Sequence, residues 1–208
     1  MVVALAVGEG VAMIEKERLG THPSDITCFV IFLFEAAIHH CAELATDRHG
    51  CCVLQKCLQH LDGGQKHRLM SEITSNALSL SQDPFGNYVV QFIIDQGVQW
   101  ATADVLDQLE GSYGHLSMQK YSSNVVEKCL KSAGPDHLAG IIQELINSPQ
   151  LGEILQDPFG NYVVQSALNE SEGAAIRVAL VESIRPHVPA LRSSPFGKKV
   201  LSNSSLKK

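Results

Sequence analysis

Apolar and polar positions alternate in a pattern that returns about every 37 residues. Each return carries a pair of adjacent aliphatic residues between polar ones. After the first four returns comes a second amphipathic stretch, clearest in Leu138, Ile141, Ile142 and Leu145, whose i, i+3, i+4, i+7 spacing is that of one helix face. The pattern therefore predicts units made of a short helix, a turn, a motif helix and a longer outer helix.

The register of these units is fixed by a repeated motif. The nine residues Asp83 to Gln91 recur unchanged as Asp157 to Gln165. Related segments place anchor residues 36, 36, 38 and 37 positions apart, at Cys51, Asn87, Ser123, Asn161 and Lys198. An aliphatic residue stands seven places before each anchor, at Leu44, Leu80, Leu116, Ile154 and Leu191. Five copies in register exclude coincidence, and a fixed period of this length is typical of repeat architectures.

No single unit of this kind can bury its apolar face alone, so neighbouring units must stack. The expected fold is all-α: a curved α-solenoid of about five stacked three-helix repeats over residues 35–208. The motif helices are expected near residues 49–57, 85–93, 121–129 and 159–167. Residues 1–34 lack the motif, and we expect them to form an atypical segment that caps Phe34, Ala37 and Ile38. A compact helical bundle does not explain the unchanged nine-residue segment.

The motif helix divides its residues between two faces. On a helix, Asn87, Tyr88 and Gln91 project from one side, whereas Val89 and Val90 point toward the stack. The aliphatic pair is kept in every copy, but the first, second and fifth motif positions are polar or aromatic and vary. Variable polar residues along one surface favour readout of a partner that itself varies in sequence.

The motif and its period resemble the Pumilio, or PUF, family of RNA-binding repeats. The resemblance implies that the first and fifth motif residues contact a base edge and that the second stacks between bases, one base per repeat. The implied RNA-binding residues are Cys51, Cys52, Gln55, Asn87, Tyr88, Gln91, Ser123, Asn124, Glu127, Asn161, Tyr162 and Gln165.

The resemblance also implies which bases are read. The Asn and Gln pairs of the second and fourth copies match uracil, Ser123 with Glu127 matches guanine, and Cys51 with Gln55 matches adenine. A carboxylate suits guanine because it accepts from the two adjacent N–H donors on that base edge. Since the family binds RNA antiparallel to its repeats, the order read is 5′-U-G-U-A-3′.

The chain departs from the family pattern in three places. Cys52 stands where an arginine or aromatic residue is common, and a thiol stacks poorly on a base. Lys198, Lys199 and Ser202 match no base, so the fifth copy, near residues 196–203, is expected to be a C-terminal cap with a lysine near a phosphate. The family usually has eight repeats, whereas this sequence has four coded copies.

Charge limits the kind of nucleic acid that fits. The formal net charge is −6, and residues 41–208 carry 14 basic and 17 acidic residues, which argues against a broad cationic surface for duplex phosphates. Single-stranded RNA read through its bases is the expected partner, with UGUA-containing mRNA untranslated regions as targets. The resemblance further implies translational or mRNA-stability control, a cytoplasmic monomer, and protein corepressors on the outer face.

Other chemistry finds little support in the sequence. Six cysteines show no CxxC spacing, so we expect reduced thiols, no metal and no cofactor. His39, His40 and Cys41 resemble a catalytic cluster only superficially, and there is no carboxylate pair or phosphate-binding glycine loop, so no enzymatic activity is expected. The apolar run from Ile26 to Phe34 is too short to span a bilayer. Two alternatives remain: an α-solenoid that binds proteins, and a PUF-related factor with weak or non-specific RNA binding.

Overall fold

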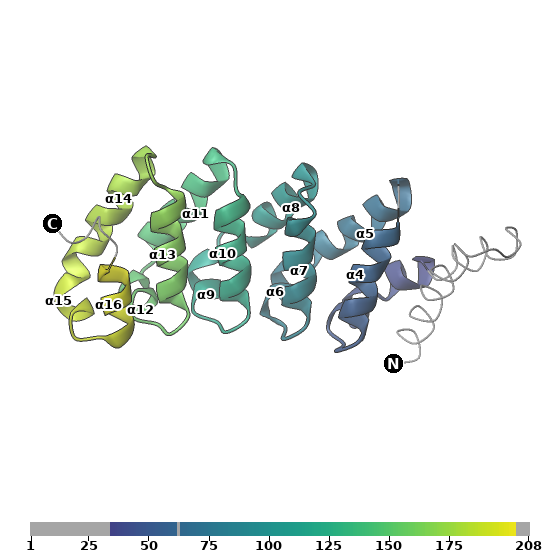
Figure 1. Cartoon of the computed structure of the whole chain (residues 1–208), viewed down its shortest axis with the longest axis horizontal. Helices are drawn as coiled ribbons and strands as arrows, with labels where there is room; N and C mark the ends of the chain where they lie inside the picture. The colour runs from purple at the N-terminus through teal and green to yellow at the C-terminus, as the bar shows by residue number, and fades with distance from the viewer. Residues whose placement is uncertain (1–33, 62, 203–208) are drawn as a thin grey trace, which may run out of the picture. The chain divides into compact units, whose positions relative to one another are not determined.

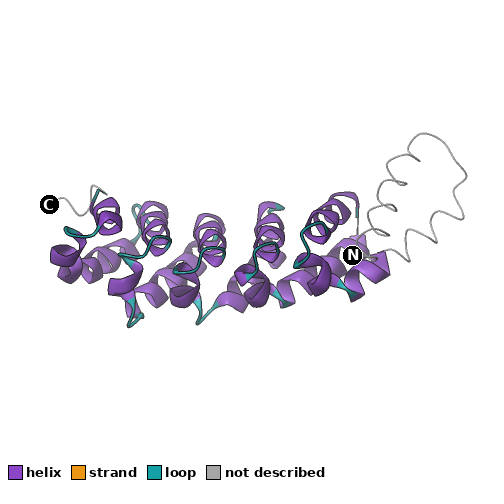
Figure 2. Ribbon diagram, turned by 90° about the horizontal axis from the view of Figure 1, so that it is seen from below, coloured by secondary structure: helices purple, strands orange, loops and turns teal. Residues whose placement is uncertain are grey.

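The computed structural model describes residues 34–61 and 63–202, and all regular secondary structure within these ranges is helical (Figure 2). The expected cap formed by residues 1–34 therefore lies almost wholly outside the described residues. The chain divides into two compact units, Met1–Val105 and Leu106–Lys208. No helix in the described ranges is long and apolar enough to cross a membrane.

The first unit contains two copies of the repeat (Figure 1). The first copy consists of α3 (Cys41–Ala45), α4 (Gly50–His60) and α5 (Gly63–Ser75). The second consists of α6 (Ala77–Gln82), α7 (Gly86–Asp95) and α8 (Gln99–Leu109), whose last residues reach into the second unit. The motif helices α4 and α7 pack against each other. The predicted order of short, motif and outer helix is confirmed in both copies.

The second unit contains two further copies and the start of a fifth. The third copy consists of α9 (Tyr113–Ser117), α10 (Ser122–Ser132) and α11 (Pro135–Asn147), and the fourth of α12 (Leu151–Ile154), α13 (Gly160–Glu170) and α14 (Ala175–Ile184). The fifth contributes η1 (Arg185–His187), α15 (Val188–Leu191) and α16 (Pro195–Leu201). Motif helix α13 packs between α10 and α16. The fifth copy has no outer helix among the described residues, and the sequence has a second amphipathic stretch only after the first four motifs.

The buried core is made of aliphatic residues at equivalent positions of the copies. The aliphatic pairs of the second, third and fourth copies are fully buried, as are the five aliphatic residues that stand seven places before the anchors. In the first and fifth copies one member of each pair, Val53 and Leu201, is only partly buried. The conserved aliphatic positions therefore form the interior of the stack, and burial is less complete in the copies nearest the ends of the described array.

In the first, second and fourth copies the turn before the motif helix is closed by an acidic side chain. Asp83 Oδ1 accepts hydrogen bonds from the backbone N–H groups of Phe85 and Gly86, both at 2.8 Å. Asp157 and Asp47 each accept an equivalent pair of hydrogen bonds from backbone N–H groups. The carboxylate thus satisfies N–H groups that a helix start leaves without partners.

The glycine in this turn is required by a close backbone approach. A Cβ atom on Gly86 would lie 2.7 Å from the carbonyl oxygen of Leu80. The third copy solves the same contact differently, because Ser122 stands at this position and its Oγ donates to the carbonyl of Leu116 at 2.8 Å. Each solution holds the short helix against the first turn of the motif helix.

Candidate nucleic-acid interface

The second motif residue is exposed in every copy. Tyr88 and Tyr162 are 58% and 45% exposed, although large aromatic side chains are usually buried. Cys52, Asn124 and Lys199 hold the same motif position and are exposed as well. The motif helices therefore offer side chains with free faces, two of them aromatic rings suited to stacking on bases.

The fifth motif residue lies about one helical turn further along and is half-buried. This holds for Gln55, Gln91, Glu127 and Gln165. Half-burial restricts the number of conformations that a long side chain can adopt, while part of its polar end stays accessible. On each of these four motif helices an exposed second residue is thus followed, three positions later, by a half-buried fifth residue.

The first motif residue is buried in the four coded copies, and here the prediction of an open polar surface at all three positions is wrong. Cys51, Asn87, Ser123 and Asn161 are between 0% and 4% exposed. The reason is local: the first turn of the motif helix packs against the preceding turn. Asn87 Nδ2 donates to the carbonyls of Asp83 and Pro84 at 2.9 and 3.0 Å. Since an amide has two N–H donors, both are used inside the repeat.

The buried asparagine holds the half-buried glutamine. Gln91 Nε2 donates to Asn87 Oδ1 at 3.0 Å, and Gln165 Nε2 donates to Asn161 Oδ1 at 3.1 Å. Within residues 34–61 and 63–202, no hydrogen bond uses the Oε1 atom of either glutamine. The amide of the glutamine is therefore oriented by the asparagine and keeps an acceptor for a ligand.

The third copy orients its fifth residue from a neighbouring helix instead. Glu127 Oε2 accepts a hydrogen bond from Ser166 Oγ at 3.3 Å, and Ser166 lies on α13. Ser166 lies just after the last motif residue and is not among the site residues that the motif predicts. A signal was present, because the two identical nine-residue segments diverge immediately afterwards, with Phe92 after one and Ser166 after the other.

The first copy carries two thiols where the others carry polar or aromatic groups. Cys51 Sγ donates to the carbonyl of Arg48 at 3.4 Å and lies 4.0 Å from Cys52 Sγ. Burial raises the pKa of the Cys51 thiol to about 11, so this thiol is neutral near pH 7. Cys52 is exposed, but its thiol presents only a small surface for stacking. The sequence already indicated that this copy has the weakest stacking position.

The fifth copy places a lysine on the stacking residue of the fourth. Lys199 Nζ lies 2.7 Å from Tyr162 Oη and 4.7 Å from the centre of the Tyr162 ring. Lys198, at the anchor position, is exposed, unlike the anchors of the other four copies. The sequence predicted a cap at this point, but it did not predict that a lysine contacts Tyr162.

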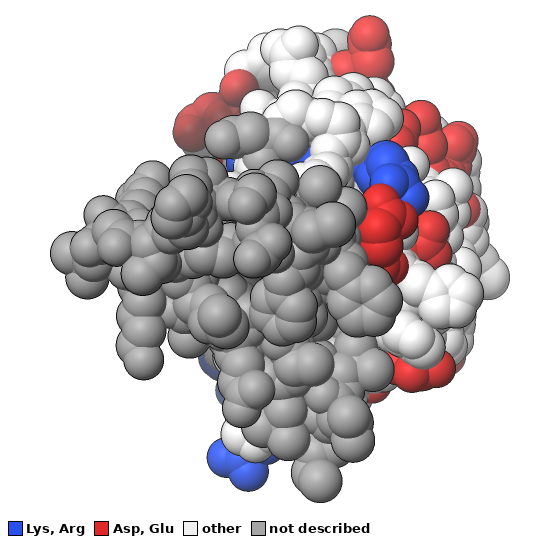
Figure 3. Space-filling view, turned by 90° about the vertical axis from the view of Figure 1, so that its right-hand side faces the viewer, with Lys and Arg blue, Asp and Glu red and all other residues white. Residues whose placement is uncertain are grey.

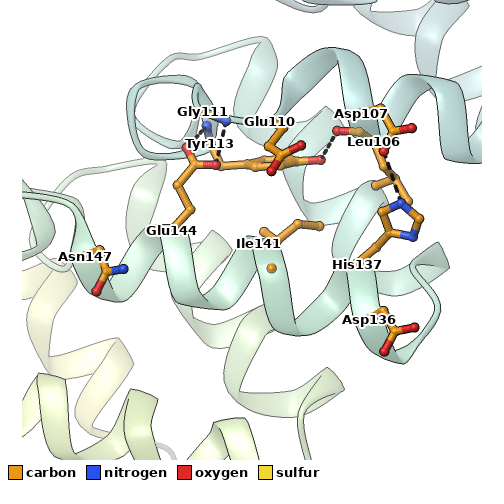
Figure 4. A pocket seen from close by; sticks show the side chains of 11 residues that line it. Leu106, Asp107, Glu110, Gly111, Tyr113, Asp136, His137, Ile141, Glu144 and Asn147 are labelled. Atoms are coloured by element: carbon orange, nitrogen blue, oxygen red, sulfur yellow. Dashed lines mark hydrogen bonds and ion pairs between the residues drawn. The ribbon is translucent and has the colours of Figure 1, made fainter.

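A pocket of about 550 Å³ in the second unit lies away from the motif residues (Figure 4). Its lining comes from the end of α8, the following turn, α9 and α11. Glu144 accepts hydrogen bonds from the backbone N–H groups of Gly111 and Tyr113, and Asp107 pairs with His137 at 3.2 Å. These contacts fasten α11 to the turn before α9, and no motif residue lines the pocket.

The surface is not rich in positive charge. Acidic side chains are spread over the described part of the face in Figure 3, with basic ones sparse among them. No group of three or more His, Cys, Asp and Glu residues suited to a metal occurs in the part of the chain that the structure describes. The chain as a whole also has more acidic than basic residues, 22 against 16.

Helical copies that each present one exposed and one half-buried side chain on the motif helix define an α-helical repeat protein. Residues 40–74, 76–109, 112–146 and 150–184 match the Pumilio-family RNA binding repeat. The chain belongs to this family, as the resemblance predicted, and the family is non-enzymatic.

Individual relatives of the chain are also Pumilio proteins. Pumilio homolog 12 of Arabidopsis thaliana is 61% identical over 177 residues, which are 85% of this chain and 30% of that protein. The Pumilio domain-containing protein C6G9.14 of Schizosaccharomyces pombe is 37% identical over 171 residues, 82% of this chain and 25% of that protein. This chain thus spans a third or less of the length of these relatives.

Solved structures share the repeat fold. The Puf4 RNA binding domain bound to the HO endonuclease RNA 3′ UTR recognition sequence is 34% identical, with a TM-score of 0.75, and the match covers 86% of this chain and 57% of that one. PUF-8 in complex with PBE-RNA is 28% identical with a TM-score of 0.75, over 88% of this chain and 54% of that one.

Proposed function

We propose that the chain binds single-stranded RNA and reads a 5′-UGUA-3′ core through its four coded motif helices. The observation that carries the proposal is the pairing of an exposed second residue with a half-buried fifth residue on α4, α7, α10 and α13, where a hydrogen bond orients the fifth residue on the last three of these helices. Puf4 and PUF-8, which share the repeat fold, are bound to RNA in their structures. A scaffold that binds only proteins would not need this pairing.

The chemistry of the fifth residues fits the proposed bases. The edge of uracil carries one N–H between two carbonyls, so it pairs with the free amide oxygens of Gln91 and Gln165. Gln91 also keeps one N–H donor for a uracil carbonyl, whereas Gln165 Nε2 donates to both the backbone and the side-chain oxygen of Asn161. Glu127 offers only acceptors and matches the adjacent N–H donors of guanine. Gln55 matches the exocyclic amine and ring nitrogen of adenine. Specificity in this proposal comes chiefly from the fifth residue.

Burial changes the role that we give to the first residue. In the free chain Asn87 and Asn161 donate both amide hydrogens to the backbone and accept from the glutamine. We therefore propose that they orient the glutamine toward the base, and that any direct contact of theirs with the base uses Oδ1. Tyr88 and Tyr162 supply the stacking surfaces.

The biological role proposed with this activity is post-transcriptional control of mRNAs through their untranslated regions, with protein corepressors on the outer face and the chain acting as a cytoplasmic monomer. Two relatives, putative pumilio homologs 7 and 8 of Arabidopsis thaliana, are named chloroplastic. The cellular compartment is therefore tested separately, by localising the tagged chain in cells.

The direct test is an equilibrium titration of the chain with 8-mer RNAs. Four base contacts of ~1–3 kcal/mol each, less the free energy of ordering a flexible strand, predict a Kd on the order of micromolar. We expect the UGUA 8-mer to bind at least tenfold more tightly than a scrambled 8-mer of the same composition. Equal affinity for the two RNAs would refute sequence-specific reading and favour a non-specific factor, and no binding to either would favour a protein-binding scaffold.

A further inference from the structure

The end of the second unit that follows α14 is basic, in contrast to the rest of the chain. Residues 185–202 contain two arginines, two lysines and no acidic residue, whereas the whole chain has 16 basic and 22 acidic residues. Lys198 and Lys199 lie on α16, which packs against the motif helix α13 of the fourth copy. Positive charge is thus placed beside the last coded motif.

Lys199 is held at one end of the Tyr162 ring. Its Nζ is 2.7 Å from the tyrosine hydroxyl oxygen but 4.7 Å from the ring centre. These two distances place the ammonium beyond the hydroxyl and not over the middle of the ring, so a face of the ring stays open for stacking. The Phe196 ring, 5.7 Å from the same ammonium, gives a second cation–π contact.

The Lys199 ammonium keeps N–H donors that a ligand can use. A lysine carries three N–H donors, and the Tyr162 hydroxyl accounts for one. Within residues 34–61 and 63–202, no ion pair joins Lys199 to a carboxylate. A cation that is positioned by aromatic contacts and has no acidic partner is suited to bind an anion.

We propose that Lys199 is a phosphate-binding residue that contacts the RNA backbone immediately 5′ of the nucleotide stacked on Tyr162. The inference rests on the proposed function: antiparallel reading places the 5′ end of the core at the fourth copy, and the strand then continues toward α16. The group that joins the first core nucleotide to the one before it is a phosphate. Lys199 would hold that phosphate while Tyr162 stacks on the base.

The nine-residue segment around Tyr88 is identical, yet no lysine contact to Tyr88 occurs among the described residues. The proposed subsite therefore depends on the fifth copy and not on the motif itself. This gives the fifth copy a role in binding in addition to capping the stack.

The experiment compares two RNAs that share the UGUA core at their 5′ end and differ only in a 5′-hydroxyl or a 5′-phosphate. We expect the wild-type chain to bind the phosphorylated RNA about threefold to fivefold more tightly, as for one exposed ion pair. K199A should lose this preference and lower the slope of log K against log salt by about 0.7, as for one single-strand phosphate contact. K199R should keep both.

Lys120 provides a matched control, because it is also exposed and lies 5.3 Å from an aromatic ring, that of Tyr121, in the turn before α10. K120A should behave as the wild type. Equal weakening of both RNAs by K199A, with unchanged thermal melting, would overturn the phosphate contact, and so would a 5′-phosphate preference that K199A retains. Failure of the proposed function itself would give a different result: the wild-type chain would bind UGUA and UUUA RNAs equally.

Discussion

Exchanging the third motif for the second should change the base that is read. The double variant Ser123→Asn with Glu127→Gln gives α10 the first and fifth residues of α7. In α7 the asparagine carbonyl accepts from the glutamine amide at 3.0 Å and so fixes its orientation. We expect the double variant to prefer UUUA over UGUA, in contrast to the wild-type chain.

The size of the effect follows from the donors and acceptors involved. In the proposed complex the wild-type carboxylate of Glu127 accepts from two guanine N–H groups, a paired contact worth ~1–3 kcal/mol of discrimination. Replacing it with an amide turns one acceptor into a donor, which opposes guanine and fits a uracil carbonyl. Taking about 2 kcal/mol for each preference, the ratio of affinities for the two RNAs should change from roughly 30-fold for guanine to roughly 30-fold for uracil.

The single variant Glu127→Gln separates the two roles proposed for the motif. Without an asparagine at position one, the new glutamine has no side-chain carbonyl partner within the motif, so guanine preference should fall without a comparable gain for uracil. Fluorescence anisotropy with UGUA and UUUA 8-mers measures both ratios, and circular dichroism melting checks that the variants fold. A folded double variant that still prefers guanine would refute the assignment of Glu127 to this base.

Three further outcomes are expected. Cys52→Tyr should strengthen UGUA binding by part of the ~1–3 kcal/mol that base stacking on an aromatic residue contributes, and unchanged affinity in the titration would argue that Cys52 does not face a base. The backbone N–H groups of Gly50 and His49 hold the pKa of Asp47 below its ordinary value of 3.8, so its stabilising effect is present above that value and is lost as pH falls through the lower pKa of the folded state. Melting temperatures from pH 6 to pH 2 should therefore fall more steeply for the wild type than for D47N, and parallel curves would contradict the contact. Burial raises the pKa of the thiols of Cys57 and Cys129 to about 12, so iodoacetamide at pH 8 should label the exposed Cys52 first; equal labelling of Cys129 in peptide maps would contradict its burial.

Much of the fold was predictable because the repeat fixes helix positions many times over. The unchanged nine-residue segment set the register, and the aliphatic pairs such as Val89 and Val90 identified the buried face correctly. The burial of Asn87 was not predictable from helical spacing, since spacing gives the direction of a side chain but not what packs over the first turn. That information lies in the contact with the preceding turn, where Gly86 approaches the Leu80 carbonyl.

Contacts between copies were the other limit of the sequence. Ser166 with Glu127 and Lys199 with Tyr162 each join residues 37 or 39 positions apart. Both pairs involve neighbouring copies, so a comparison of copies one by one does not reveal them. In one pair the partner is the residue that follows the next motif, Ser166. In the other it is Lys199, which holds the same motif position as Tyr162 in the next copy.

Selection of RNAs that bind the intact chain from a random-sequence pool tests the reading of bases most directly. The account predicts enrichment of UGUA, with guanine as the second base because of Glu127 and with the weakest preference at the adenine, where Cys52 replaces a stacking residue. Enrichment of no common sequence, or of a core unrelated to UGUA, would contradict the claim that these motif helices read RNA one base per repeat.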